Sequence, residues 1–358
     1  MPQPRFDTLI LGQGLAGSAL AWELTAAGQR VCVIDDGHRS SSSMVAAGLI
    51  NPLAGMRFSR RPEVTDWLDG ADRWYAELAR HFGHPFLHAL PMLRLFRSPR
   101  QRRFYDRRAA EPHSGDLLGA PFSAEDCPEP VAAPYGGFRQ RRTGYVDLPL
   151  LLATLRGWLA KRQALHESAL GPQEIVIDPA GVRACGLHAD RLVFCEGARL
   201  RDNPWFRDLP LQPEKGEILN LAAGDWRPRH IVNGAHWLLP LHNGELRLGA
   251  THEHHEIDQR TTAAGREQLL AAMKALRPSA LPPRVLDQQA GIRPGTSDRY
   301  PLIGRHPTQP RLWVFNGFGA RGSLTIPWYA QRLAAHLQRA APLPAEADIR
   351  RFACVPLA

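Results

Sequence analysis

The sequence predicts an α/β fold, in which a Rossmann-like dinucleotide-binding domain is joined to a second domain built on a mainly antiparallel β-sheet. Two observations lead to this class. A strand–turn–helix–strand unit occupies residues 7–36, and short apolar segments joined by Asn-Gly turns fill residues 213–250. The first pattern is typical of a parallel sheet covered by helices, and the second is typical of antiparallel hairpins.

The first unit contains three glycines at the spacing of a dinucleotide-binding turn. The apolar run at 8–11 predicts a buried strand, and it is followed by Gly12, Gly14 and Gly17 in a G-x-G-x-x-G pattern. In such a turn the first glycine allows the tight bend, the second lets the backbone approach a pyrophosphate, and the third lets the helix pack closely on the sheet. The helix predicted over residues 15–27 then directs its N-terminal N–H groups at an anion.

An acidic residue follows the second predicted strand. Residues 31–34 are apolar and end at Asp35, which lies 23 residues after Gly12, where a ribose-binding carboxylate is expected. A glycine-rich turn without function is the alternative. Because a strand precedes the turn, a helix follows it and the acid lies at the expected distance, the dinucleotide interpretation is favoured.

Composition indicates a soluble globular protein. The chain has 358 residues, of which 44% are hydrophobic and 22% charged, and it has no apolar run long enough to span a membrane. The segment before the first strand is too short for a secretion signal. The five cysteines are scattered and odd in number, which indicates reduced thiols, so we expect a cytoplasmic protein: Cys32, Cys127, Cys185, Cys195 and Cys354.

The net charge of +9 raises the possibility of nucleic-acid binding. Only Lys161, Lys215 and Lys274 are lysines, so nearly all basic residues are arginines, a bias that a GC-rich coding sequence can produce. Residues 85–142 are rich in Pro, Gly and Arg and predict a β-rich layer, with arginines and aromatics interleaved at 100–108 and 138–142. Such runs can bind RNA, although a solvated surface is the commoner explanation.

The remaining elements follow from periodicity and turn residues. Helices are predicted at 63–81, 148–162, 260–276 and 327–338, and strands at 174–178, 191–198, 213–219, 237–240, 245–250 and 312–315. The loop at 252–256, His-Glu-His-His-Glu, lacks the spacing of a zinc site, and no metal is expected. The glycines at 317, 319 and 322 precede the last helix and predict a second anion-binding or flavin-edge turn.

At these motifs the chain resembles the D-amino-acid oxidase superfamily of FAD enzymes, within it the glycine oxidase and sarcosine oxidase branch. The resemblance rests on the first glycine motif with Asp35, on Ala46–Leu49, Lys215–Glu217 and Leu246–Thr251, and on segments 291–296, 301–304 and 319–322. It implies FAD as cofactor. Some sarcosine oxidases attach the flavin through a cysteine, and because the matching place here is about Gly291, non-covalent binding is expected.

The resemblance also implies the cofactor-binding residues and the domain boundaries. The FAD-binding domain is expected at 1–84, 143–207 and 288–358, and the substrate domain at 85–142 and 208–287. Residues expected to bind FAD are Gly12, Gly14, Leu15, Ala16, Gly17, Asp35, Asp36, Ser43, Ala46, Ala47, Gly48, Leu49, Gly197, Arg293, Gly317, Phe318, Gly319, Ala320, Arg321, Gly322, Ser323 and Leu324. For the small residues at 46–48, close packing within the protein is the alternative explanation.

Three residues are expected on the substrate side. Arg293 resembles the arginine that pairs with a substrate carboxylate in this family, and Arg321 lies near another substrate-side arginine; a structural arginine is the alternative for Arg293. Trp237 stands where glycine oxidases tend to have a tyrosine. The expected activity is oxidation of the C–N bond of a small amine that carries a carboxylate, with hydride transfer to flavin N5.

Two other functions remain open from the sequence. The motifs at 249–251 and 318–322 also resemble the oxidase half of the bifunctional enzyme that trims carboxymethylaminomethyl-uridine in tRNA, for which the basic charge would matter. A non-catalytic flavin-binding protein is the other alternative. A small-molecule substrate is favoured over tRNA, and no membrane span is expected.

Overall fold

The computed structural model describes residues 5–38, 41–53 and 55–352, so the first four residues and Cys354 lie outside the described part. The chain divides into two compact units. Unit 1 comprises Met1–Ala46, Leu148–Glu214 and Ile292–Ala358, and unit 2 comprises Ala47–Asp147 and Lys215–Gly291.

Unit 1 is built on a sheet whose central strands are parallel. Strand β1 (Arg5–Leu11) lies between β2 (Val31–Asp35) and β12 (Leu187–Phe194), and β19 (Leu312–Asn316) runs parallel to β12. Outer strands complete the sheet: β9 (Leu165–Glu167), β10 (Val176–Asp178), β11 (Gly181–Ala184) and β18 (Leu302–Arg305). The carboxyl ends of the parallel strands therefore share one edge, which is the ligand-binding edge of open α/β sheets.

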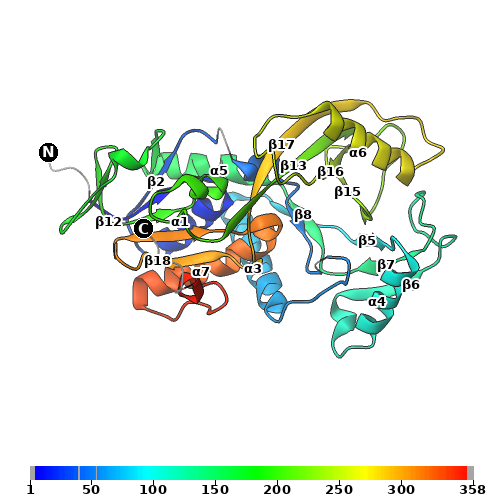
Figure 1. The fold of residues 1–358 in the computed structure, drawn as a ribbon, viewed down its shortest axis with the longest axis horizontal. Helices are drawn as coiled ribbons and strands as arrows, with labels where there is room; N and C mark the ends of the chain where they lie inside the picture. Colours follow the sequence, from blue (N-terminus) through cyan, green and yellow to red (C-terminus); the bar gives the residue numbers. More distant parts are fainter. Residues whose placement is uncertain (1–4, 39–40, 54, 353–358) are drawn as a thin grey trace. The chain divides into compact units, whose positions relative to one another are not determined.

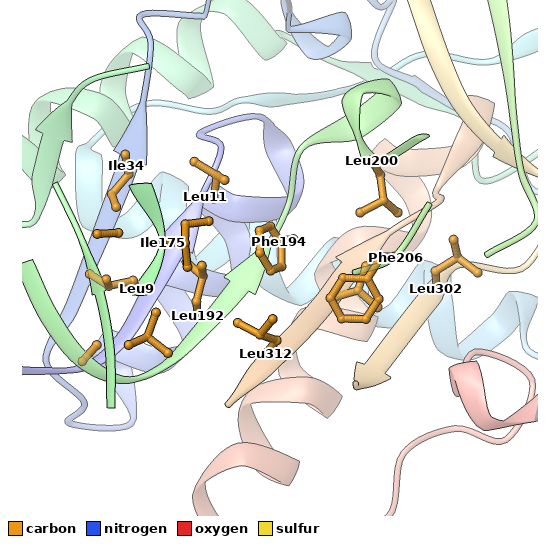
Figure 2. Packing of buried hydrophobic residues seen from close by; sticks show 14 of the residues in the cluster. Leu9, Leu11, Ile34, Ile175, Leu192, Phe194, Leu200, Phe206, Leu302 and Leu312 are labelled. Carbon is orange, nitrogen blue, oxygen red and sulfur yellow. The ribbon is translucent and has the colours of Figure 1, made fainter. Parts of the chain in front are cut away.

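Helices and a continuous apolar core hold this sheet. Helix α1 (Leu15–Ala26) packs against α7 (Gly322–Arg339), and its Trp22 ring lies 4.9 Å from Trp158 of α5 (Leu148–Lys161). The core on the sheet joins side chains from β1, β2, β12, β18 and β19, including Leu9, Leu192 and Leu312 (Figure 2). Because these strands are buried, their sequences read as continuous apolar runs.

Unit 2 contains the predicted antiparallel sheet. Its strand order is β17-β13-β16-β15-β14-β5-β7-β6, and among the pairs with recorded register only β14–β5 is parallel. The strands are β5 (Met92–Leu95), β6 (Leu118–Phe122), β7 (Gly137–Gln140), β13 (Leu211–Ala222), β14 (Ile231–Asn233), β15 (Trp237–Pro240), β16 (Glu245–Gly249) and β17 (Val285–Thr296). Helix α6 (Ala263–Leu276) covers part of this sheet near β16 (Figure 1).

A small sheet and two helices complete unit 2. Strands β3 (Leu49–Ile50), β8 (Gly144–Val146) and β4 (Leu87–Ala89) pair in that order. Helix α3 (Val64–Phe82) matches the predicted amphipathic helix and ends at Gly83, whose φ is +80°. Helix α4 (Pro99–Ala109) contains the arginine-rich run that the sequence placed in a β-rich layer.

One short helix and two 3-10 turns connect the main strands and helices of the two units. Helix α2 (Ser42–Val45) precedes β3, and the 3-10 turns η3 (Gly197–Asp202) and η4 (Gly319–Arg321) follow β12 and β19. In the described residues, no helix is both long enough and apolar enough for a membrane crossing.

The observed elements depart from the predictions at three places. Helix α7 begins at Gly322, five residues before the predicted start at Pro327, so the proline lies inside its second turn. The prediction of a β-rich layer at 85–142 was wrong for residues 99–109, which are helical. Residues 47–84, predicted with the FAD-binding domain, cluster with unit 2.

Candidate functional site

The turn between β1 and α1 is so crowded that it requires glycine at two of its three positions. Gly12 has φ of +101°, and a Cβ atom on it would lie 2.6 Å from the carbonyl oxygen of Cys195. A Cβ atom on Gly17 would lie 1.9 Å from the carbonyl oxygen of Gly12. These contacts belong to the fold itself: the turn packs on the end of β12, and α1 packs on the turn.

Gly14 is different because its surroundings are open and polar. The nearest atoms to a Cβ there would be the hydroxyl oxygens of Ser43, at 3.4 Å, and Ser41, at 3.6 Å. Gly14 is the N-cap of α1 and provides no side-chain cap, and the first turn contains no acid. The N–H of Leu15 donates to Ser43 Oγ, whereas none is recorded from Ala16 within the described residues. A helix N-terminus with open N–H groups and hydroxyls fits a pyrophosphate.

Asp35 at the end of β2 is buried, and four described donors point at its carboxylate. These are the backbone N–H groups of Gln13, Gly37 and His38, at 2.8–3.0 Å, and Nη1 of Arg156, at 3.0 Å. Burial opposes ionisation, but the hydrogen bonds from these N–H groups and the nearby His38 hold the pKa of Asp35 below its ordinary value. The carboxylate thus fixes the shape of the glycine turn, and a ribose hydroxyl would share its lone pairs.

Arg156 is a site residue that the sequence analysis missed. It lies on α5 and joins three groups: Asp35, the side-chain oxygen of Gln13 at 2.8 Å, and Glu167 of β9 at 2.9 Å. No motif marks it, because it comes from a helix 121 residues away from Asp35 in the sequence. The other predicted acid, Asp36, forms an ion pair of 2.9 Å with Arg199 of η3.

The turns that follow β12 and β19 are connected by one asparagine. Asn316, buried at the end of β19, donates from Nδ2 to the carbonyl oxygen of Gly197 at 3.0 Å. Its Oδ1 accepts from the N–H of Gly317 at 2.8 Å. The structure therefore brings the predicted residues Gly197 and Gly317 together, through a residue that the sequence analysis did not select.

The second glycine turn leads into α7, as the sequence predicted. Gly317 has φ of +80°, and a Cβ atom there would lie 2.9 Å from Thr296 Cγ2. Phe318 is buried against Phe315, with ring centroids 4.8 Å apart. Gly319 and Ala320 lie in η4, which ends at Arg321, and Gly322 begins α7. Ser323 and Leu324 are buried in the first turn of α7, which contains no acid and no side-chain cap. Like α1, helix α7 therefore has an N-terminus that no side chain caps.

Arg293 lies on β17 and is already held by a carboxylate of this chain. Its Nη1 donates to Glu214 Oε2 at 3.0 Å, and both side chains are about one-fifth exposed. No partner is recorded for its Nη2 and Nε within the described residues. Glu214 was not anticipated from the sequence. The pair keeps the guanidinium in place and leaves one edge of it for a second carboxylate.

Arg321 is directed at a neighbouring loop. Its Nη2 donates to the carbonyl oxygen of Arg299 at 3.1 Å. That loop is itself braced, because Arg351 pairs with Asp298 at 2.8 Å and Thr296 donates to the carbonyl oxygen of Tyr300 at 2.7 Å. Arg321 therefore contributes to the position of the turn that precedes α7.

Unit 2 gathers the predicted segment 47–49 and Trp237 in one apolar cluster. Ala47 is buried in it together with Tyr145, and Leu49 and Trp237 pack against it. Gly48 has φ of +70°, and a Cβ atom there would lie 2.0 Å from the carbonyl oxygen of Val146. The close approach that requires glycine at this position is thus made by β8 of the protein, which is the packing explanation left open by the sequence. Ala46 ends α2 in unit 1.

The same cluster borders two stacked imidazoles that the sequence analysis did not connect. His88 stacks on Tyr145 with ring centroids 4.9 Å apart and on His242 with centroids 5.2 Å apart. The Tyr145 hydroxyl lies 3.3 Å from His242 Nδ1. Desolvation, followed by the neighbouring His242, lowers the pKa of His88, so this imidazole favours its neutral form.

The chain is similar to known proteins along nearly its whole length. The chain is 26% identical over 346 residues to the glycine oxidase of Pseudomonas aeruginosa, covering 91% of this chain and 93% of the relative. It is 26% identical to the tRNA 5-methylaminomethyl-2-thiouridine biosynthesis bifunctional protein of Aromatoleum aromaticum. That match covers 95% of this chain but only 58% of the longer relative. The iminodiacetate oxidase of a Chelativorans species shares the fold, with a TM-score of 0.81, 22% identity, and coverage of 96% of this chain and 98% of that one.

The family model described as FAD dependent oxidoreductase matches residues 7–336, and the first glycine turn fits such a cofactor. Within the described residues no partner is recorded for the N–H of Ala16, and with the hydroxyls of Ser41 and Ser43 beside Gly14 it would supply donors for the pyrophosphate of FAD. The predicted cofactor is thus confirmed, and a non-catalytic flavin-binding protein is no longer favoured. The chain belongs to the FAD-dependent oxidoreductase family and is an FAD-dependent enzyme.

Proposed function

We propose that the enzyme oxidises the C–N bond of a small amine or amino acid that carries a carboxylate, and that water then hydrolyses the resulting imine. The observation that carries this proposal is the arrangement at Arg293. Glu214 holds one nitrogen of its guanidinium at 3.0 Å, and the other edge keeps donors for a substrate carboxylate. The relatives named glycine oxidase and iminodiacetate oxidase agree, since both names denote oxidation of carboxylate-bearing amines.

FAD, when bound, supplies the hydride acceptor, so the protein needs to provide alignment and electrostatics more than acids and bases. In the proposal, the N-terminus of α1 and Ser43 hold the pyrophosphate. Asp35 and Asp36 shape the adenosine side, and the turn at 317–324 with Gly197 lies at the flavin side. Binding is proposed to be non-covalent, because Gly291 stands at about the place of the flavin-linking cysteine of some sarcosine oxidases and has no side chain.

On the substrate side, Arg293 fixes the carboxylate, and charge-assisted bonds to a planar guanidinium restrict the orientation of the Cα–H bond. Arg321 positions the loop at 299 and the start of α7. Trp237 is proposed to limit side-chain size; its indole lies over Gly249, where a Cβ atom would be 2.5 Å from Trp237 Cζ2. The indole is therefore held in one orientation by the strand beneath it.

An anaerobic reduction assay tests the proposal. The purified FAD enzyme is mixed with glycine, sarcosine or iminodiacetate, and flavin absorbance is followed without oxygen, so that the electron acceptor does not matter. Ethylamine, which lacks the carboxylate, and glycolate, which lacks the amine, are the matched controls. We expect bleaching by at least one carboxylate-bearing amine and none by either control. Equal reduction by ethylamine would remove the role given to the carboxylate.

A tRNA substrate is the second candidate, and the basic helix α4 is the observation that favours it, together with the bifunctional tRNA relative. Several of its arginines are already engaged: Arg102 pairs with Asp106 at 3.0 Å and Arg108 pairs with Glu111 at 2.6 Å. Retardation of tRNA in a gel at low salt, lost at moderate salt, would support it, because phosphate contacts are strongly salt-dependent. Absence of retardation at low salt would exclude it.

A further inference from the structure

Unit 1 contains a cavity of about 860 Å³ beside the start of β19 and the adjoining middle of β12. Arg191 of β12, the ends of the β18–β19 hairpin at Arg305 and Arg311, and His336 of α7 line it. Its volume lies within the range of small-molecule sites.

This cavity is separate from the glycine turns. Strands β12 and β19 are parallel, so their amino ends share one edge of the sheet and their carboxyl ends the opposite edge. Trp313 lines the cavity, whereas Gly317 begins the second glycine turn four residues later, which corresponds to roughly 13 Å along a strand. A ligand in this cavity would therefore not occupy the FAD site proposed above.

The charges around the cavity do not balance. The two acids that line it, Asp190 and Asp348, already pair with Arg5 and Arg350. Three further guanidinium groups of the lining form no ion pair within the described residues: Arg191, Arg305 and Arg311. The cavity therefore has a surplus of positive charge.

These three arginines differ in how firmly they are held. Arg191 is half-buried and donates to the carbonyl oxygen of Leu337 at 3.1 Å, and desolvation lowers the pKa of its guanidinium. Arg311 donates to the carbonyl oxygens of Asp190 and Pro179. Arg305 is exposed at the rim, and the described residues give it no hydrogen bond or ion pair. The carboxylates of Asp190 and Asp7 lie near enough to offset part of this effect on Arg191, but its recorded hydrogen bond goes to a carbonyl group. A partly desolvated guanidinium in this setting favours an anion.

Part of the wall is apolar and belongs to the core of unit 1. Leu209 and Ile349 are members of the core cluster that contains Leu312 and Phe206, both labelled in Figure 2. Trp313 lies edge-on to His336, with ring centroids 5.4 Å apart, and Phe352 packs against the same core. A solvated arginine surface would be flat and polar, whereas this one encloses apolar walls.

We infer that the cavity lined by Arg191, Arg305 and Trp313 is a second binding site, for a small organic anion with a flat apolar body. The anionic group is bound at the guanidinium groups, and the body lies against Leu209, Ile349 and the aromatic side chains. A carboxylate and a phosphate present the same chemistry to arginine, so the class is an aromatic or alicyclic carboxylate or phosphate monoester.

Isothermal titration of the FAD-loaded enzyme with 1-naphthoate and with 1-naphthyl phosphate tests this inference, and uncharged 1-naphthylmethanol is the control probe. The expected result is one saturable site per chain for at least one of the two anions, with at least about tenfold weaker binding of the alcohol. The tighter of the two anions identifies the anionic group. The flavin absorption spectrum is recorded in the same titration and is expected to stay unchanged, since a ring stacked on the flavin would shift it.

Two variants and one control locate the site. Arg305→Glu replaces a cation for whose guanidinium the described residues give no partner, and it is expected to weaken anion binding about tenfold or more. Leu343 also lines the cavity, so Leu343→Trp fills it and is expected to abolish binding. Arg162→Glu makes the same charge change just after the end of α5, outside the cavity, and is expected to leave binding within about twofold. FAD content and melting temperature establish that each variant is folded.

Three outcomes would overturn the inference. The first is the absence of saturable anion binding, the second is equal binding of the alcohol, and the third is an equal fall of binding in Arg162→Glu and Arg305→Glu. Binding that shifts the flavin spectrum would count against the location in the same way. None of these readouts depends on amine oxidation, so failure of the proposed function would leave this test intact.

Discussion

The side-chain amide of Asn316 and the backbone of Gly197 are joined by a hydrogen bond of 3.0 Å, which ties the turn after β19 to the turn after β12. The same amide accepts from the N–H of Gly317 at 2.8 Å. Both turns follow parallel strands at the ligand-binding edge of the sheet, so one buried side chain sets the spacing of two segments that we propose to lie near the flavin.

Replacing Asn316 by Ala should therefore loosen both turns. The variant loses two hydrogen bonds and leaves the half-buried carbonyl of Gly197 without this donor, which should destabilise unit 1 by about 1–3 kcal/mol. Thermal unfolding and the FAD content of the purified protein measure the effect. Asn243→Ala, in an exposed turn of unit 2, is the control and should retain the parent's FAD content. A normal melting temperature and normal FAD content of Asn316→Ala would contradict this role.

The two helical glycines Gly17 and Gly157 predict opposite results for the same substitution. A methyl group on Gly17 would lie 1.9 Å from the carbonyl oxygen of Gly12, so Gly17→Ala must displace α1 from the turn and should yield protein without FAD. A Cβ atom on Gly157 of α5 would meet no other atom within 4 Å, so Gly157→Ala should be stabilising by about 0.5–1 kcal/mol. Flavin absorbance and unfolding curves measure both. A Gly17→Ala protein that retains FAD would be incompatible with the packing described for this turn.

Lys215 and Asp258 predict a pH dependence of stability. Lys215 is 2% exposed, and its Nζ donates to Asp258 at 2.6 Å. The hydrogen bonds from Lys215 and Arg260 lower the pKa of Asp258 from 3.8 to about 2. Because the folded pKa is depressed, the stabilisation is present above pH 3.8 and is lost as the pH falls through about 2.

Asp258→Asn should therefore have a lower melting temperature than the parent protein at pH 7. The difference between the two melting temperatures should become smaller as the pH falls from about 4 to about 2. Asp225→Asn replaces an exposed acid in the same unit. As the control, it should have the parent's melting temperature at every pH of this range. Thermal unfolding followed by circular dichroism across this range provides the measurement. Parallel pH profiles of Asp258→Asn and the parent protein would show that the pair does not control acid stability.

The sequence predicted the parts of the fold that depend on local pattern. The glycine turn, the strands at 237–240 and 312–315 and the helix at 148–162 follow from residues that are neighbours in the chain. Helix α4 was missed because the density of arginine, proline and glycine around it favoured short strands, although Ser98 and Pro99 form a typical helix start and Ser98 accepts from the N–H of Gln101. The start of α7 was misplaced because Pro327 resembles a first helical residue.

The missed site residues have partners far away in the sequence. Arg156 meets Asp35 across 121 residues, Asn316 meets Gly197 across 119, and Glu214 meets Arg293 across 79. Periodicity and spacing describe neighbours along one element, so these pairs become visible only when the fold brings separate helices, strands and turns together. Family resemblance selected Arg293, but not the acid that holds it.

The proposed function depends most on the binding of the substrate carboxylate by Arg293. Rapid anaerobic mixing of the FAD enzyme with the amine that reduces it gives the apparent dissociation constant for flavin reduction, and Arg293→Leu, Arg293→Lys and the control Arg266→Leu are compared with the parent. We predict that Arg293→Leu retains FAD but raises this constant by about a hundredfold or more, consistent with loss of two charge-assisted bonds. Arg293→Lys should recover part of the affinity, and Arg266→Leu, on the surface of α6, should behave as the parent does. An Arg293→Leu enzyme that binds FAD and reduces it with an unchanged constant would show that Arg293 does not bind the substrate.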